Sequence, residues 1–228
     1  ENEKIFHASA AELTEYRGDA LSVVTACNEK AVPLPAVHGI CDEEFLRGKA
    51  PMTKEEVRTV SLSKLRLQED SVCYDVGAGT GSVSVEMALR AWKGQVYAIE
   101  KKEDALALLK ENRRKFATDN LEIVPGTAPE AMVELPVPTH AFIGGSSGNM
   151  NEIIRLLLDK NPEVRIVINC ITLETVTEAM NAIRDFSLTD VDIVQLSAAR
   201  SKSIGRYHMM MGENPIYIIS CSGRGEEI

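Results

Sequence analysis

The chain has 228 residues, 44% of them hydrophobic and 26% charged, a composition typical of a globular protein with a buried core and not of a disordered segment. This length accommodates one mid-sized domain with an appendage. The formal net charge of −9 disfavours a general nucleic-acid binder, because phosphate binding needs a concentrated positive face.

The cysteines and the apolar segments indicate which cellular compartment and which kinds of binding site the sequence favours. Five cysteines lie far apart and never as a C-x-x-C pair, so the sequence favours neither a disulfide framework nor a zinc site. No apolar run approaches the roughly 18 to 20 residues that span a bilayer. The first residues also lack the basic start and apolar centre of a signal peptide. We therefore expect a cytoplasmic protein with no bound metal, no membrane contact and no nucleic-acid partner.

The first 35 residues differ in texture from the rest of the chain. The stretch HASAAELTEY (7–16) predicts a short helix, and ALSVVTAC (20–27) predicts a strand. The following NEKAVPLPAVHG (28–39) carries two prolines and predicts a linker. We expect residues 1–35 to form an amino-terminal appendage and residues 36–228 to form the principal domain.

The principal domain opens with a predicted helix. Thr53, with Glu56 three residues later, matches the T-x-x-E capping box that starts a helix. Short β-rich runs then alternate with helical patterns, which predicts a parallel sheet covered by helices on both faces. Strands are expected at 71–77, 95–100, 121–126, 139–145, 165–171, 190–196 and 215–221, and helices at 82–92, 103–117, 149–160 and 173–186, with a shorter piece near 128–134.

A glycine-rich turn follows the first predicted strand, in YDVGAGTGSVSVEMA (74–88). Glycine permits positive φ and close approach of the backbone to a ligand, and the start of the next helix supplies free N–H groups. The pattern favours a nucleotide-like ligand. Dinucleotide binding calls for G-x-G-x-x-G, which would need a glycine at position 82, where the chain has Ser82. A tight turn without any ligand is the alternative.

A carboxylate closes the second predicted strand. Glu100 ends QVYAIE and lies 19 residues beyond Gly81. A carboxylate at this position can accept hydrogen bonds from two ribose hydroxyls. Dinucleotides and other nucleoside cofactors both contain a ribose, so the glycine spacing has to decide between them.

The pattern D-x-G-x-G-x-G resembles motif I of the class I S-adenosylmethionine-dependent methyltransferases. Four further segments together resemble the precorrin methyltransferases of cobalamin biosynthesis, which methylate carbon 15 and decarboxylate an acetate arm. The resemblance implies a class I α/β fold with a seven-stranded, mostly parallel sheet, S-adenosyl-L-methionine as cofactor, a precorrin substrate and a homotetramer. The four segments are GICDEEFLRGKAPMTKEEVR (39–58), GTAPEAM (126–132), HAFIGGSSGNMNEII (140–154) and INCITLETVTEAM (168–180).

The appendage has a resemblance of its own. IFHASAAELTEYRGDALSVVTAC (5–27) is similar to the carboxyl end of the carbon-5 methyltransferase domain that is often fused ahead of this family. The resemblance implies a fused or partner carbon-5 domain, and a simple extension is the alternative.

The resemblance also implies the residues of the cofactor site. Family members often have an aspartate where this chain has Thr127, so a backbone or hydroxyl contact is expected there instead of a carboxylate contact. The implied cofactor residues are Thr53, Gly77, Ala78, Gly79, Thr80, Gly81, Glu100, Thr127 and Ala128.

A polycarboxylate substrate needs cations that an acidic chain must concentrate locally. Arg47 and Lys49 in FLRGKAPMT are candidates for binding the substrate, and AARSKSIGRYH (198–208) supplies further charged residues after the sixth strand. In that second stretch Arg200 is a candidate catalytic contact, while Lys202 and Arg206 fit a solvated loop equally well. His208 could donate a proton or pair with a carboxylate, although a loop histidine without catalytic role fits the pattern too.

Small residues follow the fourth predicted strand, where class I methyltransferases commonly face the transferred methyl group. Gly144, Gly145 and Ser146 are candidate catalytic positions, and Ser147 is a candidate substrate contact. Ser146, Ser147 or Asn149 is also expected to cap the next helix. A methyltransferase for another substrate, such as RNA or a small molecule, and an inactive cofactor-binding module remain alternatives.

Overall fold

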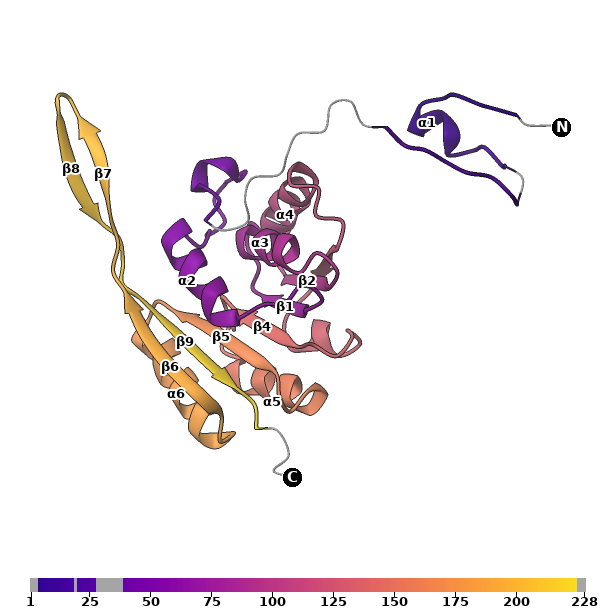
Figure 1. The fold of residues 1–228 in the computed structure, drawn as a ribbon. Coiled ribbons are helices and arrows are strands. Elements are labelled where there is room, and N and C mark those ends of the chain that lie inside the picture. The colour runs from indigo at the N-terminus through magenta and orange to yellow at the C-terminus, as the bar shows by residue number, and fades with distance from the viewer. Residues whose placement is uncertain (1–3, 19, 28–38, 225–228) are drawn as a thin grey trace. The chain divides into compact units, whose positions relative to one another are not determined.

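The computed structural model describes residues 4–18, 20–27 and 39–224 (Figure 1). The chain forms two compact units, Glu1–Leu34 and Pro35–Ile228. Residues 28–38, which hold most of the predicted linker and the predicted domain boundary, lie outside the described residues.

The first unit contains one short helix, α1 (Ala10–Leu13). Its amino end has a capping box: the Ser9 Oγ accepts the Glu12 N–H at 3.4 Å, and Glu12 Oε2 accepts the Ser9 N–H at 2.8 Å. The predicted strand at 20–27 is wrong, since these residues have no strand pairing. Leu21 is 99% exposed and Val23 is 95% exposed, so the apolar run has no surface in the described part of this unit on which to pack.

The second unit is built on a seven-stranded sheet in the order β3-β2-β1-β4-β5-β9-β6. The first five strands are parallel, and β9 lies antiparallel between β5 and β6. The seven predicted strands are therefore confirmed, with ends that shift by at most two residues. Their bounds are β1 Val72–Val76, β2 Gln95–Glu100, β3 Leu121–Pro125, β4 His140–Ile143, β5 Arg165–Cys170, β6 Thr189–Leu196 and β9 Ile216–Ser222.

Helices cover both faces of this sheet, as Figure 1 shows. Apolar side chains of α5 and α6 pack in one buried cluster with Tyr74 and Ile166. Side chains of α2, α3 and α4 pack on the other face with Cys73 and Val167. The helices are α2 Glu55–Leu65, α3 Ser82–Arg90, α4 Glu103–Lys115, α5 Met150–Lys160 and α6 Leu173–Asp185, with short 3₁₀ turns η1 at Asp42–Glu44 and η2 at Glu130–Met132.

The predicted helix cap at Thr53 is wrong, and the one at Asn149 is confirmed in position but not in its side-chain bond. The N-cap of α2 is Lys54, without a side-chain hydrogen bond, and the Thr53 carbonyl instead accepts a bond from the Arg58 guanidinium at 2.7 Å. The N-cap of α5 is Asn149, also without a side-chain cap bond, and its Nδ2 donates to the Ala128 carbonyl at 2.9 Å. In both cases a tertiary contact replaces the local cap.

A β-hairpin stands where the sequence predicts a charged loop. Strands β7 (Ala199–Ile204) and β8 (Tyr207–Gly212) pair antiparallel around Gly205, which has a φ of +61°. The hairpin extends away from the seven-stranded sheet (Figure 1). Its strands carry no buried residue, so the burial alternation that marks a half-buried strand is missing.

Two special features are absent from residues 4–18, 20–27 and 39–224. No helix there has the length and apolarity to cross a bilayer. No cluster of three or more His, Cys, Asp or Glu side chains there is arranged to hold a metal ion.

Candidate active site

The glycine turn joins the carboxyl end of β1 to the start of α3. Gly77, Gly79 and Gly81 have φ values of +77°, +57° and +79°, which residues with a side chain rarely adopt. Space is restricted as well. A Cβ on Gly77 would lie 2.9 Å from the carbonyl oxygen of Gly145, and a Cβ on Gly79 would lie 2.8 Å from that of Pro51. The turn therefore needs a bare backbone.

Glu100 lies beside this turn because β2 is the parallel neighbour of β1. The residue is 8% exposed. Its Oε2 accepts the Gly79 N–H at 2.8 Å, and its Oε1 accepts the N–H groups of Lys101 at 2.8 Å and Lys102 at 2.9 Å. Three backbone donors thus fix the carboxylate. A carboxylate has about four acceptor positions, so capacity remains for a ligand hydroxyl.

A cavity that is partly open to solvent lies across the carboxyl ends of β1 to β4. These ends are adjacent because the strand order is β3-β2-β1-β4 and all four strands are parallel. The cavity brings together nine of the predicted site residues: Gly77, Gly79, Glu100, Thr127, Ala128, Gly144, Gly145, Ser146 and Ser147.

Four predicted cofactor residues do not line this cavity, and three of them belong to the glycine turn. Gly81 is the N-cap of α3, and Ala78 donates its N–H to the Ile99 carbonyl at 3.1 Å. Thr80 is buried, and its Oγ1 has no hydrogen-bond partner among the described residues. Thr53 lies in the loop ahead of α2 and is tied to Arg58 through its carbonyl.

Asp75, two residues before the turn, is a buried carboxyl group. It is 1% exposed, its Oδ2 accepts a bond from Ser84 Oγ, and its Oδ1 has no partner among the described residues. Burial raises the pKa of Asp75 to about 7; the Ser84 bond opposes this shift and the charge of Glu100 adds to it. This carboxyl group therefore holds its proton well above the usual range of an aspartate.

A second cavity shares the segment 144–147 with the first. It is again partly open to solvent. Its other walls come from the carboxyl end of β5 and the first turns of α6, including Asn169, Thr172 and Glu178. The end of β1 holds the shared segment in place, because Gly144 and Gly145 both donate N–H bonds to the Val76 carbonyl, at 2.9 Å and 3.2 Å.

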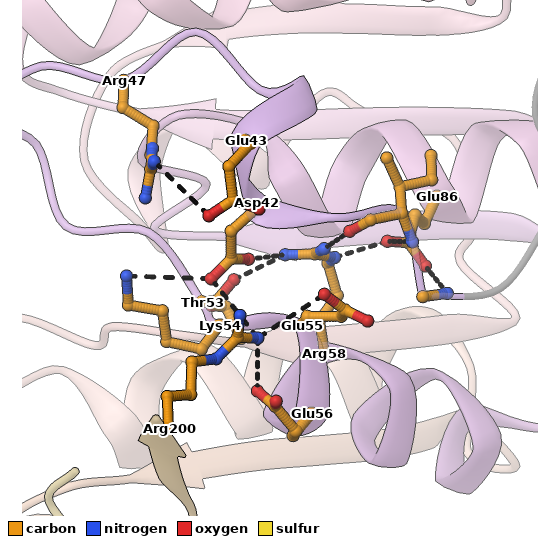
Figure 2. A network of polar contacts seen from close by, with 12 residues as sticks. Asp42, Glu43, Arg47, Thr53, Lys54, Glu55, Glu56, Arg58, Glu86 and Arg200 are labelled. Atoms are coloured by element: carbon orange, nitrogen blue, oxygen red, sulfur yellow. Dashed lines mark hydrogen bonds and ion pairs between the residues drawn. The ribbon is translucent and has the colours of Figure 1, made fainter. Parts of the chain in front are cut away.

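The chain ahead of α2 is held by a buried arginine (Figure 2). Arg58 is fully buried and pairs with Glu86 of α3 and with Asp42, which lies 3.3 Å away. Its guanidinium also donates to the backbone carbonyls of Thr53 and Ile40. This network anchors the segment from which Ala50 and Pro51 reach the wall of the first cavity.

Arg200 joins the same network from the base of the hairpin (Figure 2). Its Nη2 lies 2.8 Å from Glu56, 3.5 Å from Glu55 and 3.9 Å from Asp42. The hydrogen bond to Glu56 raises the pKa of Arg200, and the same bond lowers the pKa of Glu56. The structure therefore places Arg200 against the first turn of α2.

The other predicted cations lie at the surface. Arg47 is 4.0 Å from Glu43, and Lys49 is exposed. His208 is exposed on β8, opposite Ser203 of β7. Among the described residues, none of these side chains and no residue of the hairpin lines either cavity.

Sequence reasoning missed several residues that line the cavities. Lys101 and Lys102 follow Glu100 directly, and the Lys101 Nζ donates to Ser147 Oγ at 2.9 Å, across the first cavity. A pair of lysines after a strand is common on solvated surfaces, so the sequence offers no signal. Pro51 and Glu178 reach the site only through the packing of distant elements.

The parallel sheet, the bare glycine turn after β1, the carboxylate that ends β2 and the cavity across four strand ends define the class I S-adenosylmethionine-dependent methyltransferase architecture. The model of the precorrin methyltransferase domain matches residues 44–222. The chain belongs to this family.

Three relatives show how similar this chain is to other proteins. A probable cobalt-precorrin-6B C(15)-methyltransferase (decarboxylating) from Pyrobaculum calidifontis is 44% identical over 188 residues, which cover 81% of this chain and 96% of that protein. The structure of precorrin-6Y C5,15-methyltransferase from Geobacter metallireducens matches with a TM-score of 0.77 and 40% identity, over 82% of this chain and 98% of that one. The structure of the carboxyl-terminal domain of precorrin-6Y C5,15-methyltransferase from Rhodobacter capsulatus matches with a TM-score of 0.71 and 27% identity, over 82% and 98%.

The cofactor of this family is S-adenosylmethionine, and the first cavity fits it. Glu100 keeps acceptor capacity for ribose hydroxyls. Ile99, Ala105 and Ala128 provide apolar wall for a flat base. The bare backbone at Gly77 and Gly79 leaves room for close approach of the rest of the cofactor.

Proposed function

We propose that this protein transfers a methyl group from S-adenosylmethionine to carbon 15 of a precorrin and removes carbon dioxide from the acetate arm on carbon 12, as a step of cobalamin biosynthesis. One observation carries the proposal: in a chain of the precorrin methyltransferase family, two cavities adjoin along residues 144–147. One suits the cofactor, and the other is free for a macrocycle.

The residues of the first cavity would hold the cofactor. Glu100 would bind the ribose, and the turn 77–81 would lie along the amino acid part. Thr127 and Ala128 would contact the base, with Thr53 as an outer support. When bound, the cofactor supplies a methyl group already activated on a sulfonium. The protein's part is then orientation, which by effective-molarity arguments is worth on the order of 7 to 11 kcal/mol.

The segment 144–147 would set the position of the substrate. Gly144 and Gly145 have no side chains, so a ring system could come close to the cofactor cavity here. A Cβ on Gly145 would meet nothing within 4 Å, so the space beside it is open. Ser146 and Ser147 would donate hydroxyl bonds to the substrate, and Lys101, held at Ser147, would pair with one of its carboxylates.

The remaining predicted cations lie outside the two cavities, so they could contact only the outer part of a bound substrate. Arg47 and Lys49 lie on the loop that ends at Ala50 and Pro51, and we propose that they attract substrate carboxylates. Arg200 is already paired with Glu56, so a substrate carboxylate would have to compete for it. Substituting Arg200 or His208 by alanine tests whether either contributes to turnover, and we expect less than a tenfold loss for both, because neither lines a cavity.

We also propose a cytoplasmic homotetramer. Exposed apolar side chains of the hairpin support assembly, since Tyr207, Met209 and Met210 are 51% to 64% exposed. Residues 1–35 would be the end of a fused carbon-5 methyltransferase domain. The Rhodobacter capsulatus relative, in which the similar part is a carboxyl-terminal domain, supports this idea.

The experiment uses purified protein, methyl-labelled S-adenosylmethionine and cobalt-precorrin-6B. We expect label at carbon 15 and release of one carbon dioxide per methyl group. Glu100→Ala should weaken cofactor binding at least tenfold by calorimetry, whereas Glu122→Ala, on neighbouring β3 and outside both cavities, should not. Tight cofactor binding without reaction on any precorrin would exclude the proposed substrate.

A further inference from the structure

The second cavity has an unusual charge for a site that would receive a polycarboxylate. Its lining comes from glycines, serines, threonines, apolar side chains and one asparagine, and its only titratable side chain among the described residues is Glu178. No lysine, arginine or histidine of the described chain lines it. A carboxylate that entered the part of this cavity formed by β5 and α6 would meet no cation of the described residues there, because the Lys101 ammonium bound to Ser147 lines the first cavity and not the second.

The Glu178 side chain faces a cavity and is not bonded to other protein groups in the described part of the chain. It lies in the second turn of α6, is partly buried, and makes no hydrogen bond or ion pair with any described residue. Both oxygens of this carboxyl group are therefore open to a ligand in the cavity. Glu178 also lies close enough to β5 to act on Cys170. Burial raises the pKa of the Cys170 thiol to about 11, and the charge of Glu178 adds to this shift.

The proposed reaction needs a group of this kind. Loss of carbon dioxide breaks the bond between the acetate methylene and the carboxyl carbon, and the electron pair stays on the methylene carbon and the conjugated ring. That carbon must then take up a proton to become a methyl group. A cation beside the acetate would stabilise the carboxylate and oppose its loss, whereas an apolar or acidic wall would favour it.

Two carboxyl groups in one site cannot both ionise easily, so one proton is shared between them. In such a pair, the acetate that loses carbon dioxide would be the ionised member, and Glu178 would be the protonated one. After the carbon–carbon bond breaks, the proton passes from the Glu178 carboxyl oxygen to the methylene carbon. Glu178 is left as a carboxylate and regains a proton from solvent.

We propose that Glu178 is the proton donor of the decarboxylation half of the reaction and that the second cavity receives the acetate arm that is lost. This inference rests on the proposed function. It assigns the two halves of the reaction to different walls of the site: methyl transfer occurs along residues 144–147, and proton delivery comes from α6.

The test compares methyl transfer with carbon dioxide release in single variants, with cobalt-precorrin-6B and doubly labelled reactants. General acids contribute about 10²- to 10⁴-fold. In Glu178→Gln we therefore expect methyl transfer within about threefold of the wild type and a fall of at least tenfold in carbon dioxide released per methyl group. Glu178→Asp, which keeps the acid on a shorter side chain, should recover part of the loss.

Glu174→Gln is the matched control, because Glu174 lies one turn earlier on the same helix, is exposed and lines neither cavity. It should behave as the wild type. Cofactor affinity, measured for every variant, shows that the fold is intact. An unchanged ratio of carbon dioxide to methyl in Glu178→Gln would overturn the role of Glu178 alone. A wild-type protein that methylates no precorrin would overturn the proposed function and this inference with it.

Discussion

The cofactor half of the sheet and the hairpin are built on opposite principles. Strands β1 and β2 are buried along nearly their whole length, and the cavity forms where they end. Strands β7 and β8 bury no residue, and they are held to the main body through the network of Arg200. Packing therefore specifies the first region, while backbone pairing and a few charges specify the second. Substitutions should lower the unfolding free energy strongly in the first region and only slightly in the second.

The largest effect is expected for Arg58→Leu. Removing the guanidinium leaves Glu86 as a buried carboxylate without its charged partner, and Asp42 keeps, among the described residues, only the longer pairs with Lys54 and Arg200. Loss of a buried partner of this kind typically costs about 3 to 5 kcal/mol of unfolding free energy. Urea unfolding measures the loss. Lys93→Ala, which removes an exposed pair with Glu69, is the control and should cost no more than about 1 kcal/mol. Equal losses in the two variants would contradict the anchoring role of Arg58.

A somewhat smaller effect should appear in the pH dependence of Asp75. Its pKa is raised from 3.8 to about 7, so the folded protein binds a proton that the unfolded chain releases. Stability from this group is therefore full below about pH 4 and is lost as the pH rises to about 7. A tenfold difference in proton affinity between the folded and unfolded states corresponds to about 1.4 kcal/mol, so the total is a few kcal/mol.

Asp75→Asn should flatten the unfolding free energy across that window in the absence of cofactor. Asp192 provides a control of opposite sign, because the bond from Lys64 lowers its pKa and its contribution is lost as the pH falls. If Asp75→Asn kept the wild-type slope between pH 4 and pH 7, the carboxyl group would have to be ionised in the fold.

Gly77→Ala should damage the cofactor site with a moderate loss of stability. The new Cβ would lie 2.9 to 3.1 Å from three backbone atoms of Gly145, at a φ of +77°. Backbone strain of this kind costs on the order of 1 to 3 kcal/mol. We expect at least tenfold weaker binding of S-adenosylmethionine in calorimetry. Gly212→Ala, at the end of β8, places its Cβ in open space and should bind as the wild type does.

The smallest effect is expected on the hairpin. Met210→Lys changes a side chain that is 64% exposed, so the unfolding free energy of an isolated subunit should change by no more than about 0.5 kcal/mol. If the tetramer uses this face, sedimentation will show smaller species. Met180→Lys, 41% exposed on α6, should leave the assembly unchanged. A loss above about 1 kcal/mol in a monomeric sample would mean that the hairpin packs against its own subunit.

The residues that the sequence predicted well share a local cause. The glycine spacing at 77–81 and the carboxylate at Glu100 could be placed because a strand-to-helix turn and a strand end are short-range features. The cap at Thr53 was predicted wrongly, and Asn149 caps its helix without the expected side-chain bond, for the converse reason. Both positions make tertiary contacts, with Arg58 and with Ala128, that no local pattern contains.

The hairpin could not be predicted from local sequence patterns either. Its strands bury nothing, so AARSKSIGRYH and the methionines after it lack the alternation that identifies a strand against a core. The cations predicted to gather at the substrate site separated for a related reason. Arg200 was drawn to the carboxylates of Glu55 and Glu56, which lie 145 and 144 positions away in sequence.

The order of the seven sheet strands and of helices α2 to α6, the glycine turn and the family could all be predicted from the residues, because buried periodicity and a turn that requires glycine restrict which residues can be used. The tertiary fold alone set which side chains meet. It joined β4, β5 and α6 around a second cavity, set Glu178 on that wall without a cation, and enclosed Arg58 between Asp42 and Glu86. Contacts between distant segments depend on packing of the whole sheet, and no short stretch of sequence encodes them.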